Sequence, residues 1–259
     1  MTQNIIFFDI DNTLLDSDKN LPKSTKKAIQ ALQDEGHIVA IATGRTPFAF
    51  ENLRKELGIE SYVSLNGQYV VHQGEVIHQH PLDTEALQQL TDYALEQDHP
   101  VVYVDHEDWR SNKENDESVT NAIGSLKIPH EVSYDPEYYV GRDIYQGLLF
   151  CTDGEEAEYE KRFSQFDFIR WHPASVDVLP QGGSKARGIE KAIEKMEVAP
   201  ENVYAFGDGR NDIEMLRAVQ NSVAMGNAED IVKEAAKSVT KSVDEDGIEH
   251  GLKLVGLLK

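Results

Sequence analysis

The 259-residue chain has few positive charges, a single cysteine and no long apolar run. Lys and Arg total 25 against 46 Asp and Glu, so the formal net charge is −21. A surface this acidic repels nucleic-acid backbones and anionic membranes, and we expect neither as a partner. It also repels anionic small molecules. A phosphate-binding site would therefore need local positive charge from a metal ion or from a few cationic side chains.

The single cysteine, Cys151, excludes an intramolecular disulfide and gives no sign of oxidising secretion. Because it ends the apolar run 147–150, we expect a buried strand thiol rather than a nucleophile. Residues 1–4 lack the basic start and apolar stretch of a signal peptide. No apolar run approaches the roughly 20 residues that cross a bilayer. These absences predict a cytoplasmic protein and leave its oligomeric state open.

Hydrophobic residues make up 40% of the chain, enough for a substantial core. Short apolar runs alternate with amphipathic stretches, which is typical of a parallel sheet covered by helices. The pattern predicts strands near 5–8, 37–42, 62–65, 203–206 and 222–225, and helices near 24–35, 185–196, 211–219, 229–237 and 247–258. We therefore predict a doubly wound α/β fold with a mainly parallel sheet.

The middle of the chain has a different pattern of predicted elements. Residues 68–71 and 75–80 flank Gly74 and indicate a hairpin. A separate series of predicted helices and strands then begins, with Pro81-Leu82 and residues 180–183 as hinges. We expect residues 83–181 to form an inserted α/β domain, with residues 1–82 and 182–259 forming the core.

The first strand is followed directly by Asp9-Ile10-Asp11-Asn12-Thr13. In open α/β sheets, ligands bind beyond the carboxyl ends of the strands. The spacing can direct Asp9 and Asp11 into the same crevice, where they repel each other unless a cation or a shared proton intervenes. Taken alone, the segment is explained equally well as an Asp-rich turn.

Two other strand ends and one helix start favour the functional interpretation. Thr43 offers a hydroxyl donor, and Gly44 lets the backbone approach a ligand closely. The run 207–212, Gly-Asp-Gly-Arg-Asn-Asp, suits an oxygen-liganded ion such as Mg²⁺. Lys185 lies at a helix start, where the helix dipole disfavours a cation; this placement hints at another task, although a solvated lysine is the more frequent case. Together these segments offer a nucleophile, a metal site and phosphate donors.

These segments resemble, in order, the four motifs of the haloacid dehalogenase superfamily: residues 9–13, Thr43, Lys185 and residues 207–212. The insert resembles the α/β cap of the Cof-type phosphatase subfamily. Asn66-Gly67 and residues 224–228 are similar to the same subfamily. Asn12 stands where glycine is frequent, but asparagine tolerates left-handed backbone geometry.

The resemblance implies a role for each matching residue. Asp9 would be the nucleophile and a metal ligand. Asp11 would be the general acid and base, with its backbone carbonyl on the metal. Asp208 would be the other protein ligand to Mg²⁺, and Asp212 would orient the site.

The remaining matches would contact the substrate. Thr43, Gly44, Lys185 and Asn211 would hold the phosphoryl oxygens. Arg45, Asn66 and Asn227 are candidates for binding the rest of the substrate.

The expected function is Mg²⁺-dependent hydrolysis of phosphate monoesters of small metabolites, such as sugar phosphates or nucleotide-like compounds, through an aspartyl-phosphate. A phosphotransferase or mutase would need an acceptor alcohol that outcompetes water. A noncatalytic module that binds a phosphometabolite is a further alternative. It would have little need of both Asp9 and Asp11. The physiological substrate is not readable from the sequence.

Overall fold

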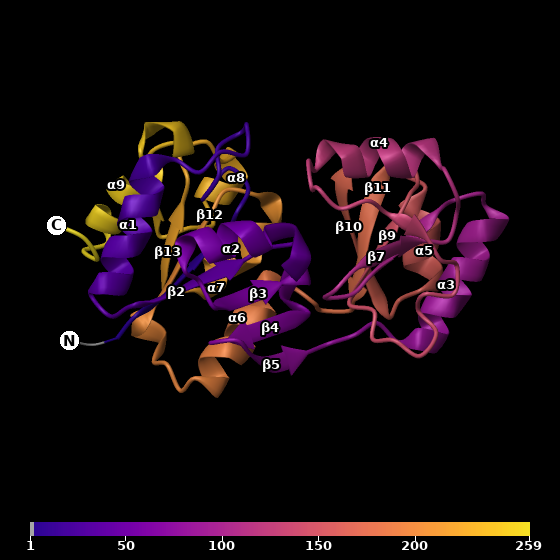
Figure 1. Ribbon diagram of the computed structural model, residues 1–259, viewed down its shortest axis with the longest axis horizontal. Helices are drawn as coiled ribbons and strands as arrows, with labels where there is room; N and C mark the ends of the chain where they lie inside the picture. Colours follow the sequence, from indigo (N-terminus) through magenta and orange to yellow (C-terminus); the bar gives the residue numbers. More distant parts are fainter. Residues whose placement is uncertain (1–2) are drawn as a thin grey trace. The chain divides into compact units, whose positions relative to one another are not determined.

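The computed structural model describes residues 3–259, which form two compact units. Unit 1 contains Met1–Arg45, Glu51–His78 and Ser184–Lys259, and unit 2 contains Thr46–Phe50 and Gln79–Gly183. Figure 1 shows that the indigo N-terminal and yellow C-terminal segments belong to the same unit.

Three details differ from the expected division of the chain. Unit 2 begins at Gln79 rather than at residue 83, and it ends at Gly183 rather than at residue 181. It also includes Thr46–Phe50, which we had expected in the core. Within unit 2 the ring of Phe48 packs edge-on against Trp109, with 5.5 Å between ring centroids. The periodicity of hydrophobic residues cannot predict this contact, because the two residues are far apart in the sequence.

Among the described residues, unit 1 contains an eight-stranded sheet in the order β14-β13-β12-β1-β2-β3-β4-β5. The strands are β1 (Ile5–Phe8), β2 (Ile38–Ala42), β3 (Ser61–Ser64), β4 (Tyr69–His72), β5 (Glu75–Gln79), β12 (Val203–Gly207), β13 (Asn221–Ala224) and β14 (Ser238–Val239). The α-helices are α1 (Lys23–Asp34), α2 (Glu51–Leu57), α6 (Lys185–Lys195), α7 (Ile213–Ala218), α8 (Asp230–Lys233) and α9 (Gly247–Leu254). The 3₁₀ turns are η2 (Leu65–Gly67), η3 (Pro200–Asn202), η4 (Arg210–Asp212) and η5 (Val243–Glu245).

Strand β1 lies at the centre of this sheet, and all four of its residues are buried. It pairs in parallel with β2 on one side and with β12 on the other. Parallel pairing extends from β14 to β3, and β4 is antiparallel to β3. A continuous apolar run is what a strand covered on both faces requires. The predicted doubly wound α/β fold is confirmed.

Helices α6 and α7 cover one face of this sheet. Ile189 of α6 and Met215 of α7 share a buried cluster with Phe7 of β1. Helix α1 packs against α9 and α2. Helix α6 approaches η2 so closely that a Cβ atom on Gly188 would lie 2.7 Å from the Cα atom of Gly67. Glycine at both positions therefore permits the close packing of α6 against η2.

Unit 2 contains, among its described residues, a six-stranded sheet in the order β10-β11-β9-β6-β7-β8. Its strands are β6 (Val101–Val104), β7 (Trp109–Ser111), β8 (Ser133–Tyr134), β9 (Gln146–Leu149), β10 (Phe166–His172) and β11 (Ser175–Pro180). Its helices are η1 (Pro47–Phe50), α3 (Thr84–Glu96), α4 (Glu117–Ser125) and α5 (Glu156–Arg162). The side chains of Asp83 and Asp116 cap α3 and α4 by accepting backbone N–H bonds. Leu90 of α3 and Tyr159 of α5 pack with Tyr103 of β6 in one core cluster.

Several short elements differ from the sequence prediction. Strands β7, β8 and β14 have two or three residues each, too few to show a period. The helix expected near 229–237 is the four-residue α8, and the extended segment Ser238–Val239 that follows pairs with β13. The helix expected to reach 258 ends at Leu254, followed by Gly256 with φ of +77°. Within residues 3–259, no helix combines the length and apolar character that a membrane crossing needs.

Candidate active site

The sheet of unit 1 brings the two acidic motifs together. Asp9 follows β1, and its backbone N–H donates to the carbonyl of Phe206 in β12 at 2.9 Å. Asp208 follows β12 directly. Because β1 and β12 are parallel neighbours, their carboxyl ends meet at the same edge. Asp9 and Asp208, which are far apart in the sequence, therefore lie close together in the fold.

A cluster of three carboxylates lies at this edge. One oxygen from each of Asp9, Asp208 and Asp212 lies within 4.8 Å of the others. Asp9 and Asp212 are buried, and Asp208 is half-buried. In the part of the chain that the structure describes, this is the one group of three acidic, histidine or cysteine side chains with metal-ligand spacing.

Lys185 supplies the positive charge inside this cluster. Its Nζ donates to Oδ1 of Asp9 at 2.5 Å and to Oδ1 of Asp212 at 2.7 Å, and its side chain is fully buried. Burial alone would lower the pKa of the Lys185 ammonium, but the carboxylates of Asp212 and Asp9 hold that pKa above its ordinary value. An ammonium has three donors, and these two contacts leave one for a ligand oxygen.

Asp212 ties the acidic loop to Lys185. Its Oδ2 accepts hydrogen bonds from the backbone N–H groups of Asp208 and Gly209, at 3.0 and 2.9 Å. Its Oδ1 accepts from Lys185. With both oxygens engaged by the protein, Asp212 is placed to orient the loop that carries Asp208.

The cluster carries more negative charge than Lys185 offsets. Burial, opposed by Lys185 and reinforced by Asp212, Asp11 and Asp208, raises the pKa of Asp9 well above its usual range. Burial and the Asp212 charge raise the pKa of Asp208 to about 6. Crowded hard oxygens of this kind fit Mg²⁺, which binds proteins through one or two carboxylates. Asp9 and Asp208 are the residues that could hold it.

Asp11 lies beside two cations of the same unit. Its Oδ2 accepts from Nε of Arg45 at 2.8 Å, and its Oδ1 accepts from Nη2 of Arg45 at 2.6 Å and from Nζ of Lys19 at 2.5 Å. Burial alone raises the pKa of Asp11, but hydrogen bonds and charge from Arg45 and Lys19 hold it below its ordinary value. Lys19 was missed by the sequence analysis. The only feature of the sequence that could have indicated Lys19 is its positive charge within the acidic stretch 16–19.

The predicted phosphate-binding residues of unit 1 converge on the neighbouring loop. Thr43 is buried, and its Oγ1 accepts from the backbone N–H of Arg45 at 3.1 Å. Gly44 lies so close to Asn66 that a Cβ atom would be 3.0 Å from Oδ1 of Asn66. Nδ2 of Asn211 reaches the same Oδ1 at 3.5 Å. Asn66 has φ of +51° and is buried.

Asn227 contacts the protein on all sides of its amide. Its Nδ2 donates to the carbonyl of Asn12 and to Oδ2 of Asp208, and its Oδ1 accepts from the backbone N–H of Val243. Asn12 has φ of +53°, the left-handed geometry that asparagine tolerates. Thr13 donates to Oδ1 of Asp208 at 3.1 Å. The bond from Thr13 was not anticipated, although the residue belongs to the first motif.

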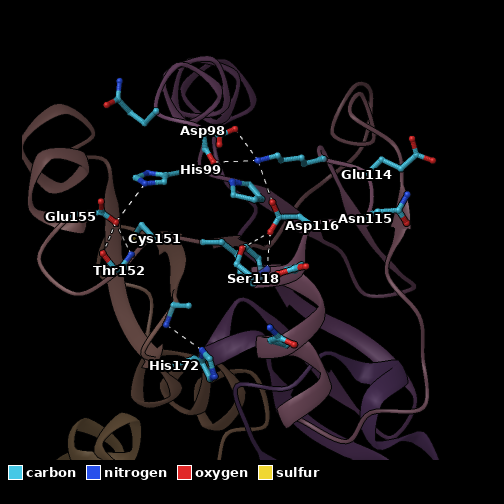
Figure 2. Close-up of a pocket in the computed structure, with 17 residues that line it drawn as sticks. Asp98, His99, Glu114, Asn115, Asp116, Ser118, Cys151, Thr152, Glu155 and His172 are labelled. Carbon is cyan, nitrogen blue, oxygen red and sulfur yellow. Dashed lines mark hydrogen bonds and ion pairs between the residues drawn. The ribbon is translucent and has the colours of Figure 1, made fainter.

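Unit 2 contains a cavity of about 960 Å³ that is lined partly by His99, Lys113, Asp116, Thr152 and Glu155 (Figure 2). Lys113 forms an ion pair with Asp116, and both the backbone N–H and the hydroxyl of Thr152 donate to Glu155. Figure 2 shows that His99 and Thr152 are directed at Glu155, and Ser118 at Asp116. Its lining has more carboxylates than cations, so it does not suit a phosphate. We assign the chemistry to the acidic cluster of unit 1.

A carboxylate nucleophile candidate, a buried lysine and an acidic loop at the carboxyl edge of a doubly wound sheet indicate an enzyme that hydrolyses phosphate esters. Comparison with known proteins gives the family. The chain belongs to the haloacid dehalogenase-like hydrolases, whose family model matches residues 6–252. The resemblance to the Cof-type subfamily is confirmed, and the chain is an enzyme of the phosphoric monoester hydrolase type.

Individual relatives agree with this assignment. The chain is 48% identical over 259 residues to "Putative phosphatase YkrA" of Bacillus subtilis (strain 168), with all of both chains covered. A crystal structure from Geobacillus kaustophilus HTA426 is 50% identical, has a TM-score of 0.94 and covers 99% of this chain and 100% of its own. The subclass IIB sugar phosphatase BT4131 is 31% identical, with a TM-score of 0.88, and covers 99% of this chain and 100% of its own.

Proposed function

We propose that this phosphatase hydrolyses phosphate monoesters of small metabolites, sugar phosphates or nucleotide-like compounds, with Mg²⁺ and through an aspartyl-phosphate on Asp9. The observation that supports this most is the position of Asp9. Its carboxylate is buried, in contact with the ammonium of Lys185 and next to Asp208 in the acidic cluster. Nucleophile, cation and metal ligand thus occupy one small volume.

In the first half of the reaction, a carboxylate oxygen of Asp9 forms a bond to phosphorus. The bond from phosphorus to the leaving oxygen breaks, and that oxygen takes a proton from Asp11. Lys185 keeps Asp9 in place and directs its remaining N–H toward the phosphoryl oxygens, where negative charge is concentrated. Thr43 and Asn211 supply neutral donors to the same oxygens.

In the second half, Asp11 acts as a base. It removes a proton from water, the water oxygen bonds to phosphorus, and the acyl phosphate bond to Asp9 breaks to release inorganic phosphate. Asp11 must leave Arg45 and Lys19 at least once per cycle, because an ion-paired carboxylate cannot donate a proton.

Mg²⁺, when bound by Asp9 and Asp208, would supply the positive charge that keeps the nucleophile ionised and offsets the charge of the phosphoryl group. The raised pKa values of Asp9 and Asp208 are the reason this charge is needed. With the chain at −21, a local cation also lets an anionic substrate approach.

The proposed substrate class is supported by the similarity to BT4131 and by the presence of unit 2. BT4131 is described as a sugar phosphatase, which favours a phosphorylated sugar here. We assign the choice of leaving group to the cap-like unit 2. Replacing residues 83–181 by a short linker should leave weak activity on activated esters and remove discrimination among metabolites.

The central experiment is to trap the intermediate. The protein is mixed with a panel of phosphorylated metabolites in Mg²⁺, quenched in acid and searched by mass spectrometry for one phosphoryl group on the peptide with Asp9. Asp9→Asn should lose both label and turnover while remaining folded. Turnover in Asp9→Asn equal to that of the parent would remove Asp9 from the mechanism. Binding of phosphorylated metabolites without any turnover would favour the noncatalytic alternative.

A further inference from the structure

Asp208 is held by hydrogen bonds to both of its carboxylate oxygens. Thr13 donates from Oγ1 to Oδ1 at 3.1 Å, and Asn227 donates from Nδ2 to Oδ2 at 3.3 Å. Thr13 is completely buried, whereas Asn227 lies at the exposed rim. Each carboxylate oxygen has about two lone-pair positions, so one such bond still leaves a position on each for a cation.

The amide of Asn227 joins three separate segments of unit 1. Its second N–H donates to the carbonyl of Asn12 at 3.0 Å, and its Oδ1 accepts from the backbone N–H of Val243 at 2.9 Å. Asn12 directly follows Asp11 in the first motif. A primary amide offers two hydrogens and one carbonyl oxygen, and all of these are engaged.

The turn that carries Asn227 is itself anchored. The backbone N–H of Gly226 donates to the carbonyl of Lys241 at 2.9 Å, and a Cβ atom at Gly226 would lie 2.6 Å from the backbone N of Ser242. Only glycine allows this approach. The amide is thus presented to Asp208 by packed backbone rather than by a mobile loop.

We infer that Asn227 is a positioning residue for the metal site, and that with Thr13 it fixes the orientation of the Asp208 carboxylate before a divalent cation binds. The inference rests on the proposed Mg²⁺ site and adds a role that substrate contact would not require. Groups that hold a metal ligand reduce the freedom lost on binding, and removing them typically weakens metal affinity by about 10–100-fold. Asn227 also holds the first motif against the same carboxylate.

The test measures metal affinity without turnover. Mn²⁺, a spectroscopic substitute for Mg²⁺, is titrated into the parent, Asn227→Ala and Asn221→Ala, and free ion is counted by electron paramagnetic resonance. Asn221 is a matched control, because its Nδ2 donates to the carbonyls of Glu201 and Val203 and does not touch Asp208. We expect Asn227→Ala to raise the Kd for Mn²⁺ about tenfold or more. Asn221→Ala should match the parent.

The outcomes separate this inference from the proposed function. A parent that binds no Mn²⁺ would overturn both. Parent binding with an unchanged Kd in Asn227→Ala would overturn the positioning role alone. A raised substrate KM with unchanged Mn²⁺ affinity would assign Asn227 to the substrate instead.

A second measurement needs no variant, so it also covers an Asn227→Ala protein that fails to fold. In the ¹⁵N-labelled parent, Mg²⁺ should shift the side-chain amide resonance of Asn227 far more than that of Asn221. Equal shifts would count against the inference.

Discussion

Arg45 holds the carboxylate of Asp11 through two hydrogen bonds, from Nε to Oδ2 at 2.8 Å and from Nη2 to Oδ1 at 2.6 Å. Lys19 adds a third at 2.5 Å. The arrangement stabilises the ionised carboxylate, which suits the base that activates water. In the proposed mechanism the same contacts oppose the acid that protonates the leaving group, so we expect Arg45 to set a balance between the two half-reactions.

The Arg45→Gln substitution should expose this balance. Without the guanidinium, the pKa of Asp11 rises, so the protonated acid persists to higher pH. The alkaline limb of kcat/KM for an alkyl phosphate should move upward in pH. Nitrophenyl phosphate, whose leaving group needs little protonation, should show no such move. Arg187→Gln removes an exposed charge from α6 and is the matched control. An alkaline limb that stays in place for the alkyl substrate would refute the role.

Lys185→Met should be strongly destabilising. Lys185 is fully buried between Asp9 and Asp212, so its removal leaves two buried carboxylates without their cation. Breaking a buried ion pair from one side costs about 3–5 kcal/mol. Lys191→Met on the same helix removes only an exposed pair with Glu194, so its effect on stability should be small. Urea unfolding in EDTA compares the two. Similar losses in both variants would mean that the buried charges are not coupled as described.

The stability of the metal-free protein should fall as pH rises. The pKa of Asp208 is raised to about 6 in the folded protein, above the ordinary value near 3.8, so the folded state binds more protons between these values. Stability from this group is present below about pH 4 and is lost as pH rises through 6. Relative to Asp208→Asn, the parent should lose about 1 kcal/mol of unfolding free energy between pH 5 and 7.

The measurement is chemical unfolding in EDTA at both pH values. Saturating Mg²⁺ at pH 7 should then stabilise the parent and leave Asp208→Asn largely unchanged, because ligand binding to the folded state adds free energy. Parallel pH curves for the parent and the variant would show that Asp208 titrates normally.

Ca²⁺ should bind the acidic cluster, support little or no turnover and compete with Mg²⁺. Mg²⁺ takes six ligands at about 2.0–2.1 Å, so in the proposed mechanism Asp9 would bind it through one oxygen and keep the other free to attack. Ca²⁺ takes about 6–8 ligands and readily engages a carboxylate through both oxygens. Initial rates are measured against Ca²⁺ at fixed Mg²⁺ and with Ca²⁺ alone. Full activity in Ca²⁺ alone would require a different arrangement of Asp9.

Much of this molecule follows from local sequence pattern. The buried run at 5–8 predicted the central strand, and the acidic residues after it and after 203–206 were expected to meet. The rule that parallel strands bring their carboxyl ends to one edge supports this expectation, and the resemblance to the haloacid dehalogenase motifs made it specific. Asn12 was expected to tolerate left-handed geometry, and it has φ of +53°. Cys151 was expected to be buried, and burial raises the pKa of its thiol to about 11.

Only the tertiary structure decided which long side chains reach which carboxylates. Lys185 bridges Asp9 and Asp212, and Lys19 reaches Asp11, through contacts set by how loops and helix α6 pack. Periodicity reports whether a residue faces a core. It does not show which carboxylate the charged end of a long, flexible side chain will contact. Asn227 shows the difference most clearly, because a residue singled out for substrate contact has its whole amide engaged by Asn12, Asp208 and Val243.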